Sequence, residues 1–199
     1  MRGKFITIYG VNNIGKSTHC RRLTERLNIE GYDAVYFKYP IYDCPPTGPQ
    51  INKILRSHEP QKVSEEELQT LFMQNRKDFE PKLRKMLEEG KIIVAEDYTG
   101  TGIAWGTAKG LSMDWVENLN KDLIEEDLAI LINGERNLKS KEAQHIHESN
   151  DELVDSVSDI LLQLADLHGW KIVPLQDQKE DTAKLIWDVV KNFLDQNSE

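Results

Sequence analysis

Residues 10–17, GVNNIGKS, have the residue types and the spacing of a phosphate-binding loop, G-x-x-x-x-G-K-[S/T]. Glycines in such a loop let successive backbone N–H groups turn inward around an anion, and the N-terminus of the following helix adds a positive dipole. The ammonium group of Lys16 would reach the β- and γ-phosphates, and the hydroxyl of Ser17 would ligate Mg²⁺. A predicted strand precedes the loop and a predicted helix follows it. The motif therefore predicts a site for nucleotide phosphates.

Two adjacent carboxylates, Glu96 and Asp97, follow the apolar run 92–95 and precede a glycine-rich turn. In open parallel sheets, ligands bind beyond the carboxyl ends of the strands, so the pair is expected in the same crevice as the phosphate loop. Consecutive residues at the end of a strand point in opposite directions. We therefore expect Glu96 to face the loop and its metal ion, and Asp97 to point in the opposite direction. The alternative for Asp97 is a solvated acid without function.

Short apolar runs alternate with helical patterns along the chain, and these elements must position the residues above. The predicted strands are rich in β-branched and aromatic residues and cover residues 5–9, 33–39, 91–96, 127–132 and 170–175. Helical spacing is found at 16–30, from a capping box at Ser64 and Glu67 to about residue 89, and at 181–194. This alternation predicts an α/β, three-layer fold, a five-stranded parallel sheet with helices on both faces.

Two segments interrupt this alternation. Residues 40–50, PIYDCPPTGPQ, contain four of the seven prolines and are expected to form an irregular loop. The stretch 134–152 is the most polar part of the chain and is expected to be either a solvated helix or a flap. No repeat or linker divides the sequence. We expect a single domain over residues 1–199, built around the phosphate loop, with a lid at about 134–152.

The composition excludes several classes of protein. The chain has 199 residues, of which 25 are basic and 34 acidic, for a net charge of −9. A nucleic-acid partner would require a basic face and is not expected. No apolar stretch approaches the ~20 residues that span a bilayer, and no signal-peptide layout is present, so we expect a cytoplasmic protein without a membrane partner. Two cysteines are too few for a disulfide framework or a Cys-rich zinc site.

A GTPase switch is one alternative for the phosphate chemistry. Residues 97–100, DYTG, match the D-x-x-G of such proteins, and residues 120–123, NKDL, are close to their guanine-binding N-K-x-D. The carboxylate that should hold the guanine edge is replaced by Leu123, and the segment lies in a helical pattern rather than after a strand. The sequence therefore favours a kinase that phosphorylates a small molecule.

Four segments of the chain resemble the thymidylate kinases in order and spacing. They are FITIYGVNNIGKST at 5–18, the dipeptide Tyr39-Pro40, LFMQNR at 71–76 and EDYTGTGIAWGTAKG at 96–110. The resemblance is good from Phe5 to Ile132 and weaker beyond. It implies transfer of the γ-phosphate of ATP to dTMP in the presence of Mg²⁺, by a protein with the P-loop kinase fold that commonly forms a homodimer.

The resemblance also implies roles for individual acceptor-side residues. Phe72 would stack on the acceptor base, and Arg76 would donate a hydrogen bond to a base carbonyl. Trp105 would lie near the 2′ position of the sugar and exclude a ribose hydroxyl. The alternatives are a core position for Phe72 and Trp105 and a solvated cation for Arg76. The other residues implied at the acceptor are Asn12, Tyr39, Pro40, Asp97, Thr101 and Gly102.

The resemblance also implies which residues act in catalysis and which bind Mg²⁺ and ATP. Catalysis would rest on Lys16, Glu96 and Asp97, and Mg²⁺ would be held by Ser17 and Glu96. ATP would contact an arginine of the lid and the whole loop, which together are Gly10, Val11, Asn12, Asn13, Ile14, Gly15, Lys16, Ser17, Thr18 and Arg136.

The chain departs from the family pattern on the acceptor side. Glu96-Asp97 stand where the family has Asp-Arg, and Asn12 stands where the family usually has Asp. The arginine that follows the family's Phe-Pro dipeptide is missing after Tyr39-Pro40. A carboxylate at position 97 can accept a hydrogen bond from a sugar hydroxyl, with Asn12 donating nearby, but it cannot hold a phosphate.

These departures leave two alternatives to a dTMP kinase. The first is a kinase of another deoxynucleotide, or of a deoxynucleoside that carries no phosphate. The second is a non-catalytic nucleotide-binding protein, against which the intact loop with Lys16 and Ser17 argues. The lid keeps Arg136, Lys139 and Lys141 but lacks the arginine-rich sequence of many bacterial members.

Overall fold

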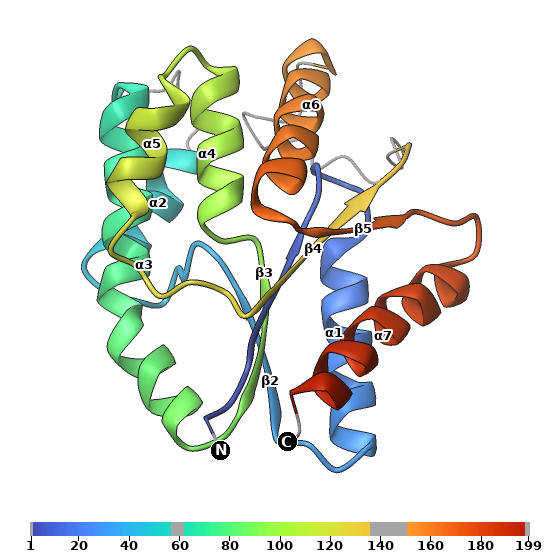
Figure 1. The fold of residues 1–199 in the computed structure, drawn as a ribbon. Helices are drawn as coiled ribbons and strands as arrows, with labels where there is room; N and C mark the ends of the chain where they lie inside the picture. Colours follow the sequence, from blue (N-terminus) through green and yellow to red (C-terminus); the bar gives the residue numbers. More distant parts are fainter. Residues whose placement is uncertain (1, 57–61, 136–150, 198–199) are drawn as a thin grey trace.

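Five strands that run in the same direction form the centre of the molecule (Figure 1). The computed structural model describes residues 2–56, 62–135 and 151–197. The strands are β1 (Phe5–Tyr9), β2 (Ala34–Lys38), β3 (Ile92–Glu96), β4 (Leu128–Asn133) and β5 (Lys171–Pro174). All neighbouring pairs are parallel, in the order β2-β3-β1-β4-β5. The predicted parallel sheet is confirmed.

The central strands consist of continuous apolar residues because both of their faces are buried. Every residue of β1 and β3 is buried, because helices cover both faces of the sheet at its centre. The edge strand β5 differs, since three of its four residues are exposed and Ile172 is 50% accessible. The β-branched and aromatic residues of the central strands therefore form the core, together with the inner faces of the helices.

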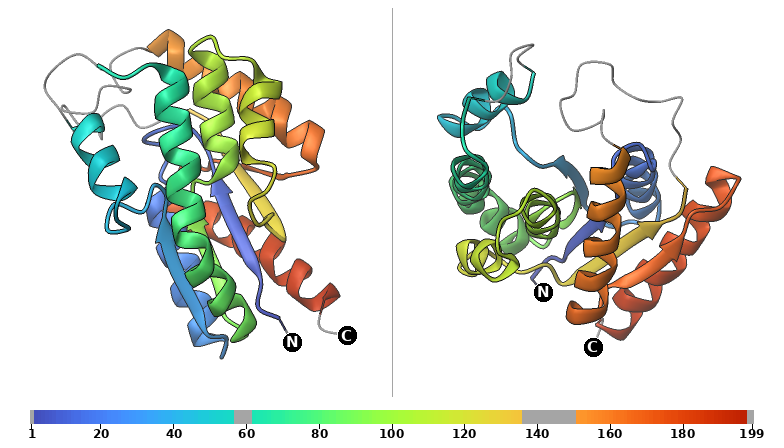
Figure 2. Two further views of the ribbon diagram at one scale, coloured as in Figure 1. Left: turned by 90° about the vertical axis from the view of Figure 1, so that its left-hand side faces the viewer. Right: turned by 90° about the horizontal axis from the view of Figure 1, so that it is seen from above.

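Helices form the two outer layers (Figure 2). On one face, α1 (Lys16–Ile29) packs against α7 (Lys179–Gln196). The other face carries α3 (Glu65–Glu88), α4 (Thr99–Ala108), α5 (Met113–Asn120) and α6 (Asp151–His168), with α4 between α5 and α6. The short helix α2 (Thr47–Leu55) packs against α3. Within the described ranges, no helix is both long and apolar enough to cross a membrane.

Two local expectations differ from the structure. The proline-rich segment 40–50 was expected to be irregular throughout, but α2 begins at Thr47 and includes Pro49. Pro49 lies in the first helical turn, where backbone N–H groups have no partner within the helix, so its missing donor costs nothing there. The glycines after Tyr98 belong to α4 rather than to a turn. A Cβ on Gly100 would lie 2.4 Å from the Trp170 ring, so close packing rather than chain reversal requires this glycine.

The capping box predicted for α3 is confirmed. The Ser64 Oγ accepts a hydrogen bond from the Glu67 backbone N–H at 3.1 Å, and the Ser64 N–H donates to Glu67 Oε2 at 2.8 Å. Both bonds satisfy donors that the helix itself leaves unpaired. The cap fixes the start of α3, which carries Phe72 and Arg76 into the site.

We expect Ser64→Ala to lower the free energy of unfolding by about 1 kcal/mol, because the Glu67 N–H loses its acceptor. Urea denaturation of the purified protein measures this change. Ser64→Asp is the control, since aspartate also accepts at this position and should retain most of the stability. Equal destabilisation by both variants would contradict a capping role.

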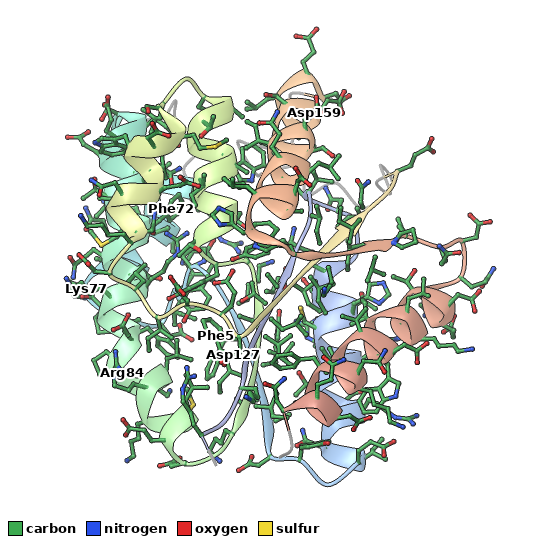
Figure 3. The ribbon with its side chains drawn as sticks, viewed as in Figure 1. Phe5, Phe72, Lys77, Arg84, Asp127 and Asp159 are labelled. Atoms are coloured by element: carbon green, nitrogen blue, oxygen red, sulfur yellow. The ribbon has the colours of Figure 1, made fainter. Side chains whose placement is uncertain are left out.

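The two ends of the sheet have different functions. At the N-terminal end, Asp127 Oδ2 accepts from the Phe5 N–H at 2.7 Å, which ties β4 to β1 (Figure 3). At the carboxyl end, β1 and β3 are neighbours, with Ile8 in register with Glu96. The phosphate loop after β1 and the acid pair after β3 therefore meet at one edge. The proposed lid at 134–152 lies almost entirely outside the described residues.

Candidate active site

The phosphate loop connects β1 to α1 and is built on two left-handed backbone positions. Gly15 is the N-cap of α1 with φ +99°, and Asn13 has φ +66°. Position 15 suits glycine because a residue with a Cβ would be strained at this φ. Lys16 is 6% exposed, and its Nζ donates to the carbonyl oxygens of Gly10 at 2.7 Å and Val11 at 3.0 Å. The loop therefore places the Lys16 ammonium group beside the N-terminus of α1.

Glu96, the last residue of β3, is held by three partners. Its carboxylate accepts from Ser17 Oγ at 2.8 Å and from the Tyr36 hydroxyl at 2.5 Å, and it lies 3.0 Å from Lys38 Nζ. Glu96 is 2% exposed. Burial by itself would raise the pKa of Glu96, but the charge of Lys38 and the Tyr36 hydrogen bond hold this pKa below its ordinary value. The carboxylate is therefore ionised beside the phosphate loop.

The contact between Ser17 and Glu96 also bears on Mg²⁺ binding, because it shows which oxygen ligands lie at the loop. They bring one hydroxyl and one carboxylate together at the loop, and Mg²⁺ prefers oxygen ligands. Among the described residues no cluster of three histidine, cysteine or acidic side chains could hold a metal ion. Mg²⁺ in kinase sites is commonly bound through one or two carboxylates together with substrate phosphates. The donor set therefore fits Mg²⁺.

Asp97 does not continue the alternation of the strand. Its φ is +62°, in the left-handed region, so its side chain turns into the same cavity as Glu96. Asp97 Oδ1 accepts from Thr101 Oγ1 at 2.8 Å and lies 3.7 Å from Lys16 Nζ. Burial and the neighbouring Glu96 charge raise the pKa of Asp97, while Lys16 opposes this rise. The expectation of opposite directions is not met, and Asp97 is not a solvated acid.

A single cavity of about 570 Å³ collects the residues that the sequence singled out. It extends from the phosphate loop, past the ends of β2 and β3, to the facing sides of α3 and α4. The predicted residues that line it are Asn12, Asn13, Gly15, Lys16, Ser17, Thr18, Tyr39, Pro40, Phe72, Arg76, Glu96, Asp97, Thr101, Gly102 and Trp105.

Four predicted residues are not part of this lining. The carbonyl oxygens of Gly10 and Val11 accept hydrogen bonds from Lys16 Nζ, and the Val11 side chain is buried in the hydrophobic core. Ile14 is buried in the hydrophobic core. Arg136 lies outside the described residues, as do Lys139 and Lys141. The cavity therefore contains every predicted acceptor residue and most of the phosphate loop.

The acceptor end is formed by the side chains of α3. Phe72 packs against the small apolar cluster of α2 and α3 and also borders the cavity. Arg76 is buried, and its guanidinium donates to the Tyr98 carbonyl at 2.8 Å and to Asn120 Oδ1 at 3.0 Å. Burial lowers the pKa of Arg76, and nearby tyrosines oppose that effect. Arg76 is thus a fixed donor inside the site and not a solvated cation of the helix surface.

Trp105 and Gly102 belong to α4, which closes the cavity opposite α3. Trp105 is 9% exposed and takes part in the hydrophobic core as well as in the cavity lining, so the two interpretations of this ring are compatible. A Cβ on Gly102 would lie 2.9 Å from Arg76 Nη2. The missing side chain of Gly102 thus leaves the space that the Arg76 guanidinium occupies.

Sequence reasoning missed seven residues that line the cavity. They are Lys38, Tyr42, Leu55, Arg56, Glu65, Gln69 and Tyr98. Lys38 carried a usable signal, because it is a cation at the carboxyl end of a predicted strand. Gln69 precedes Phe72 by one helical turn and so shares its face of α3. The pattern offered no signal for Arg56 or Glu65, whose positions depend on how α2 and α3 pack.

Residues 120–123, which are close to the guanine-binding motif of GTPases, have a structural function. Asn120 is the last residue of α5 and accepts from the Arg76 guanidinium, while its own amide donates to the Val116 carbonyl at 2.8 Å. Leu123 is buried in the core. No strand places this segment beside the phosphate loop, so it does not form a guanine pocket.

The cavity joins the phosphate loop to a second compartment, which is bordered by the aromatic ring of Phe72 and by the buried Arg76. On a parallel sheet of this order, that combination defines a P-loop nucleoside monophosphate kinase. A family model described as thymidylate kinase matches residues 8–186 of the chain. The protein belongs to the thymidylate kinase family.

Individual relatives agree with this assignment at low sequence identity. The thymidylate kinase of African swine fever virus (strain Badajoz 1971 Vero-adapted) is 26% identical over 202 residues, covering 100% of this chain and 81% of the viral protein. A probable thymidylate kinase of Thermococcus onnurineus is 32% identical over 139 residues, covering 64% of this chain and 65% of that protein. The solved thymidylate kinase of Candida albicans shares the fold, with a TM-score of 0.81 at 23% identity, covering 100% of this chain and 94% of that one.

Proposed function

We propose that this protein transfers the γ-phosphate of ATP to dTMP, giving ADP and dTDP. The observation that carries the proposal is the continuous cavity from Lys16 and Ser17 to Phe72 and Arg76. One end suits a triphosphate and the other a nucleobase, with Glu96 and Asp97 between them. The family assignment supports the same reaction.

In this proposal the donor side neutralises and orients the phosphates. Backbone N–H groups of the loop and the N-terminus of α1 hold the phosphate chain, and Lys16 reaches the transferred group. Ser17 and Glu96 would hold Mg²⁺. Bound Mg²⁺ supplies positive charge that neutralises the phosphate oxygens in the transition state. The phosphate of a nucleoside monophosphate is already ionised near neutral pH, so positioning is the main task of the protein.

The acceptor side is proposed to bind the base and the phosphate separately. Phe72 would stack on the pyrimidine ring, and Arg76 would donate to one of its carbonyl groups. Asp97 and Asn12 would face the sugar, with Tyr39 and Pro40 beside them. Lys38 and Arg56 are the cavity-lining cations, among the described residues, that remain for the acceptor phosphate once Lys16 and Arg76 are assigned.

ADP release across a panel of acceptors tests the proposal. Purified protein with ATP and Mg²⁺ is expected to turn over dTMP with a higher kcat/KM than dUMP, dCMP, dGMP or thymidine. A preference for thymidine over dTMP would instead identify a nucleoside kinase, the alternative that the missing arginines favour. Binding of ATP without ADP release above background for every acceptor would identify a non-catalytic nucleotide-binding protein.

Trp105 is expected to give the enzyme a preference for deoxyribose, because its ring would occupy the space of a 2′-hydroxyl. The measurement is the ratio of kcat/KM for dTMP to that for ribothymidine monophosphate. Trp105→Ala should lower this ratio, whereas Trp115→Ala, which replaces a tryptophan 39% exposed on α5, should not. An equal ratio for the wild type and Trp105→Ala would show that Trp105 is only a core residue.

We also propose that the protein acts in the cytoplasm as a homodimer with ATP and Mg²⁺ and without a nucleic-acid partner. The net charge of −9 supports the last point, because a phosphodiester backbone would be repelled. Sedimentation velocity at several concentrations tests the dimer. A monomer at micromolar concentration would contradict it.

A further inference from the structure

Tyr36 is a half-buried residue of β2 to which neither the sequence nor the family resemblance assigns a role. It precedes Lys38 by two residues, and Lys38 pairs with Glu96 of β3. Residues two apart on a strand share a face of the sheet, so Tyr36 and Glu96 project to the same side. The guanidinium carbon of Arg21 in α1 lies 5.4 Å from the centre of the Tyr36 ring. The ring is therefore held between its own strand and α1.

The two oxygens of the Glu96 carboxylate have different partners. The Tyr36 hydroxyl donates to Oε2 at 2.5 Å, whereas Ser17 Oγ donates to Oε1 at 2.8 Å. Lys38 Nζ also lies 3.0 Å from Oε1. Among the described residues, Tyr36 is the one donor to Oε2. Tyr36 is not one of the described residues that line the cavity, so its contact with the site is through Glu96.

This division determines what Glu96 can offer a metal ion. A hydroxyl–carboxylate hydrogen bond of this length is charge-assisted and therefore strong. It fixes a side chain of a type that otherwise has much rotamer freedom. It also engages the oxygen that a metal ion would need for a bidentate contact. Glu96 is left with one oxygen, Oε1, on the side of Ser17 and the phosphate loop.

Mg²⁺ and Ca²⁺ differ in how they use carboxylates. Mg²⁺ requires nearly octahedral coordination and is held in kinase sites through one or two carboxylates together with substrate phosphates. Ca²⁺ is larger, takes about six to eight oxygen ligands and often binds both oxygens of one carboxylate. A glutamate that offers a single oxygen therefore suits Mg²⁺ better than Ca²⁺.

We propose that Tyr36 is a positioning residue whose hydroxyl holds Glu96 as a one-oxygen metal ligand, so that the site favours Mg²⁺ over Ca²⁺. This inference rests on the proposed function, because that proposal assigns Mg²⁺ to Ser17 and Glu96. It adds a residue that touches neither nucleotide and selects the metal ion through the orientation of a carboxylate.

The test is the dissociation constant for AMP-PNP, a non-hydrolysable ATP analogue, measured by isothermal titration calorimetry in EDTA, in Mg²⁺ and in Ca²⁺. The ratio of the EDTA value to each metal value gives an enhancement factor, and the wild-type factor should be larger for Mg²⁺. Tyr36→Phe removes only the hydroxyl and should lower the Mg²⁺ factor about 10-fold, as expected when the partner of a metal ligand is lost. The Ca²⁺ factor should fall by less, because Oε2 becomes available to this ion. The value in EDTA should stay within about twofold of the wild type.

Tyr32→Phe is the matched control. Tyr32 lies between α1 and β2 and is 39% exposed, so its replacement should leave all three dissociation constants unchanged. A second comparison tests whether Tyr36 acts through Glu96. Adding Tyr36→Phe to Glu96→Gln should change neither enhancement factor further. If Tyr36→Phe lowers the Mg²⁺ factor equally with and without Glu96→Gln, the inference is overturned.

Thermal unfolding without nucleotide or metal separates positioning from a structural function. A purely structural hydrogen bond would give Tyr36→Phe a lower Tm but an unchanged ratio of the Mg²⁺ factor to the Ca²⁺ factor, and that result would overturn the inference. If Tyr36→Phe does not fold, equal enhancement by both ions in the wild type would overturn it instead. These measurements involve no acceptor and no phosphoryl transfer. A wild type that shows the expected metal preference but does not phosphorylate dTMP would therefore contradict only the proposed function.

Discussion

Replacing Lys16 with Met is expected to lower kcat by about 10²- to 10³-fold. The Lys16 ammonium is buried in the loop beside Asp97 and lies where the transferred phosphate would develop charge. A cation in such a water-poor position stabilises the transition state far more than it would in solvent. Methionine keeps most of the apolar stem, so the loop should still fold. Initial rates of ADP release at saturating ATP and dTMP measure the effect.

Lys77→Met is the control for this experiment. Lys77 follows Arg76 on α3 but is exposed at the outer side of the helix (Figure 3). Its replacement should leave kcat within about twofold of the wild type, as expected for a residue that contacts neither substrate. Turnover of Lys16→Met close to the wild-type rate would contradict the assignment of this loop as the donor site.

The second large effect is expected at Glu96. Glu96→Gln removes the buried negative charge that accepts from Ser17, so kcat should fall by roughly 10- to 100-fold for every acceptor. The Mg²⁺ concentration that gives half-maximal rate should rise, because an amide is a weaker ligand than a carboxylate. Rates measured over a Mg²⁺ titration at fixed ATP give both quantities.

Asp97→Asn is the matched variant at the next residue. The asparagine Oδ1 can still accept from Thr101, so the backbone turn at position 97 should be preserved. Its main effect should be a higher KM for dTMP, with a loss of about 10- to 100-fold in kcat/KM. Loss of the same kinetic parameter by the same factor in both variants would show that the two carboxylates share one function. Unchanged kcat and KM in Asp97→Asn would show that the Asp97 charge has no function in the reaction.

Local sequence patterns were sufficient for the five strands, for helices α1, α3 and α7, and for the phosphate loop. The loop motif spans eight consecutive residues, 10–17, and works through backbone geometry and a helix N-terminus that follow it directly. The capping box of α3 depends only on residues three apart. Continuous apolar runs predicted buried parallel strands, because helices cover both faces of such a sheet. These features need no knowledge of distant contacts, so the sequence alone predicted them.

The site depended on contacts between segments far apart in the chain. Glu96 reaches Ser17 across 79 residues because β3 pairs with β1, and no local pattern states which strands are neighbours. The left-handed backbone at Asp97 turned a side chain that strand alternation had assigned to the opposite direction. Pro49 joined α2 because a first helical turn tolerates proline.

The acceptor end of the cavity shows most clearly which features depend on local sequence and which depend on tertiary packing. The sequence by itself determined that Phe72 and Arg76 share a helix, because their spacing is a property of α3 alone. Only the packing of α4 against α3 decided that the Arg76 guanidinium lies in the space beside Gly102. Burial is a property of the folded chain, and it made Arg76 a donor fixed inside the site rather than a solvated cation of the helix surface.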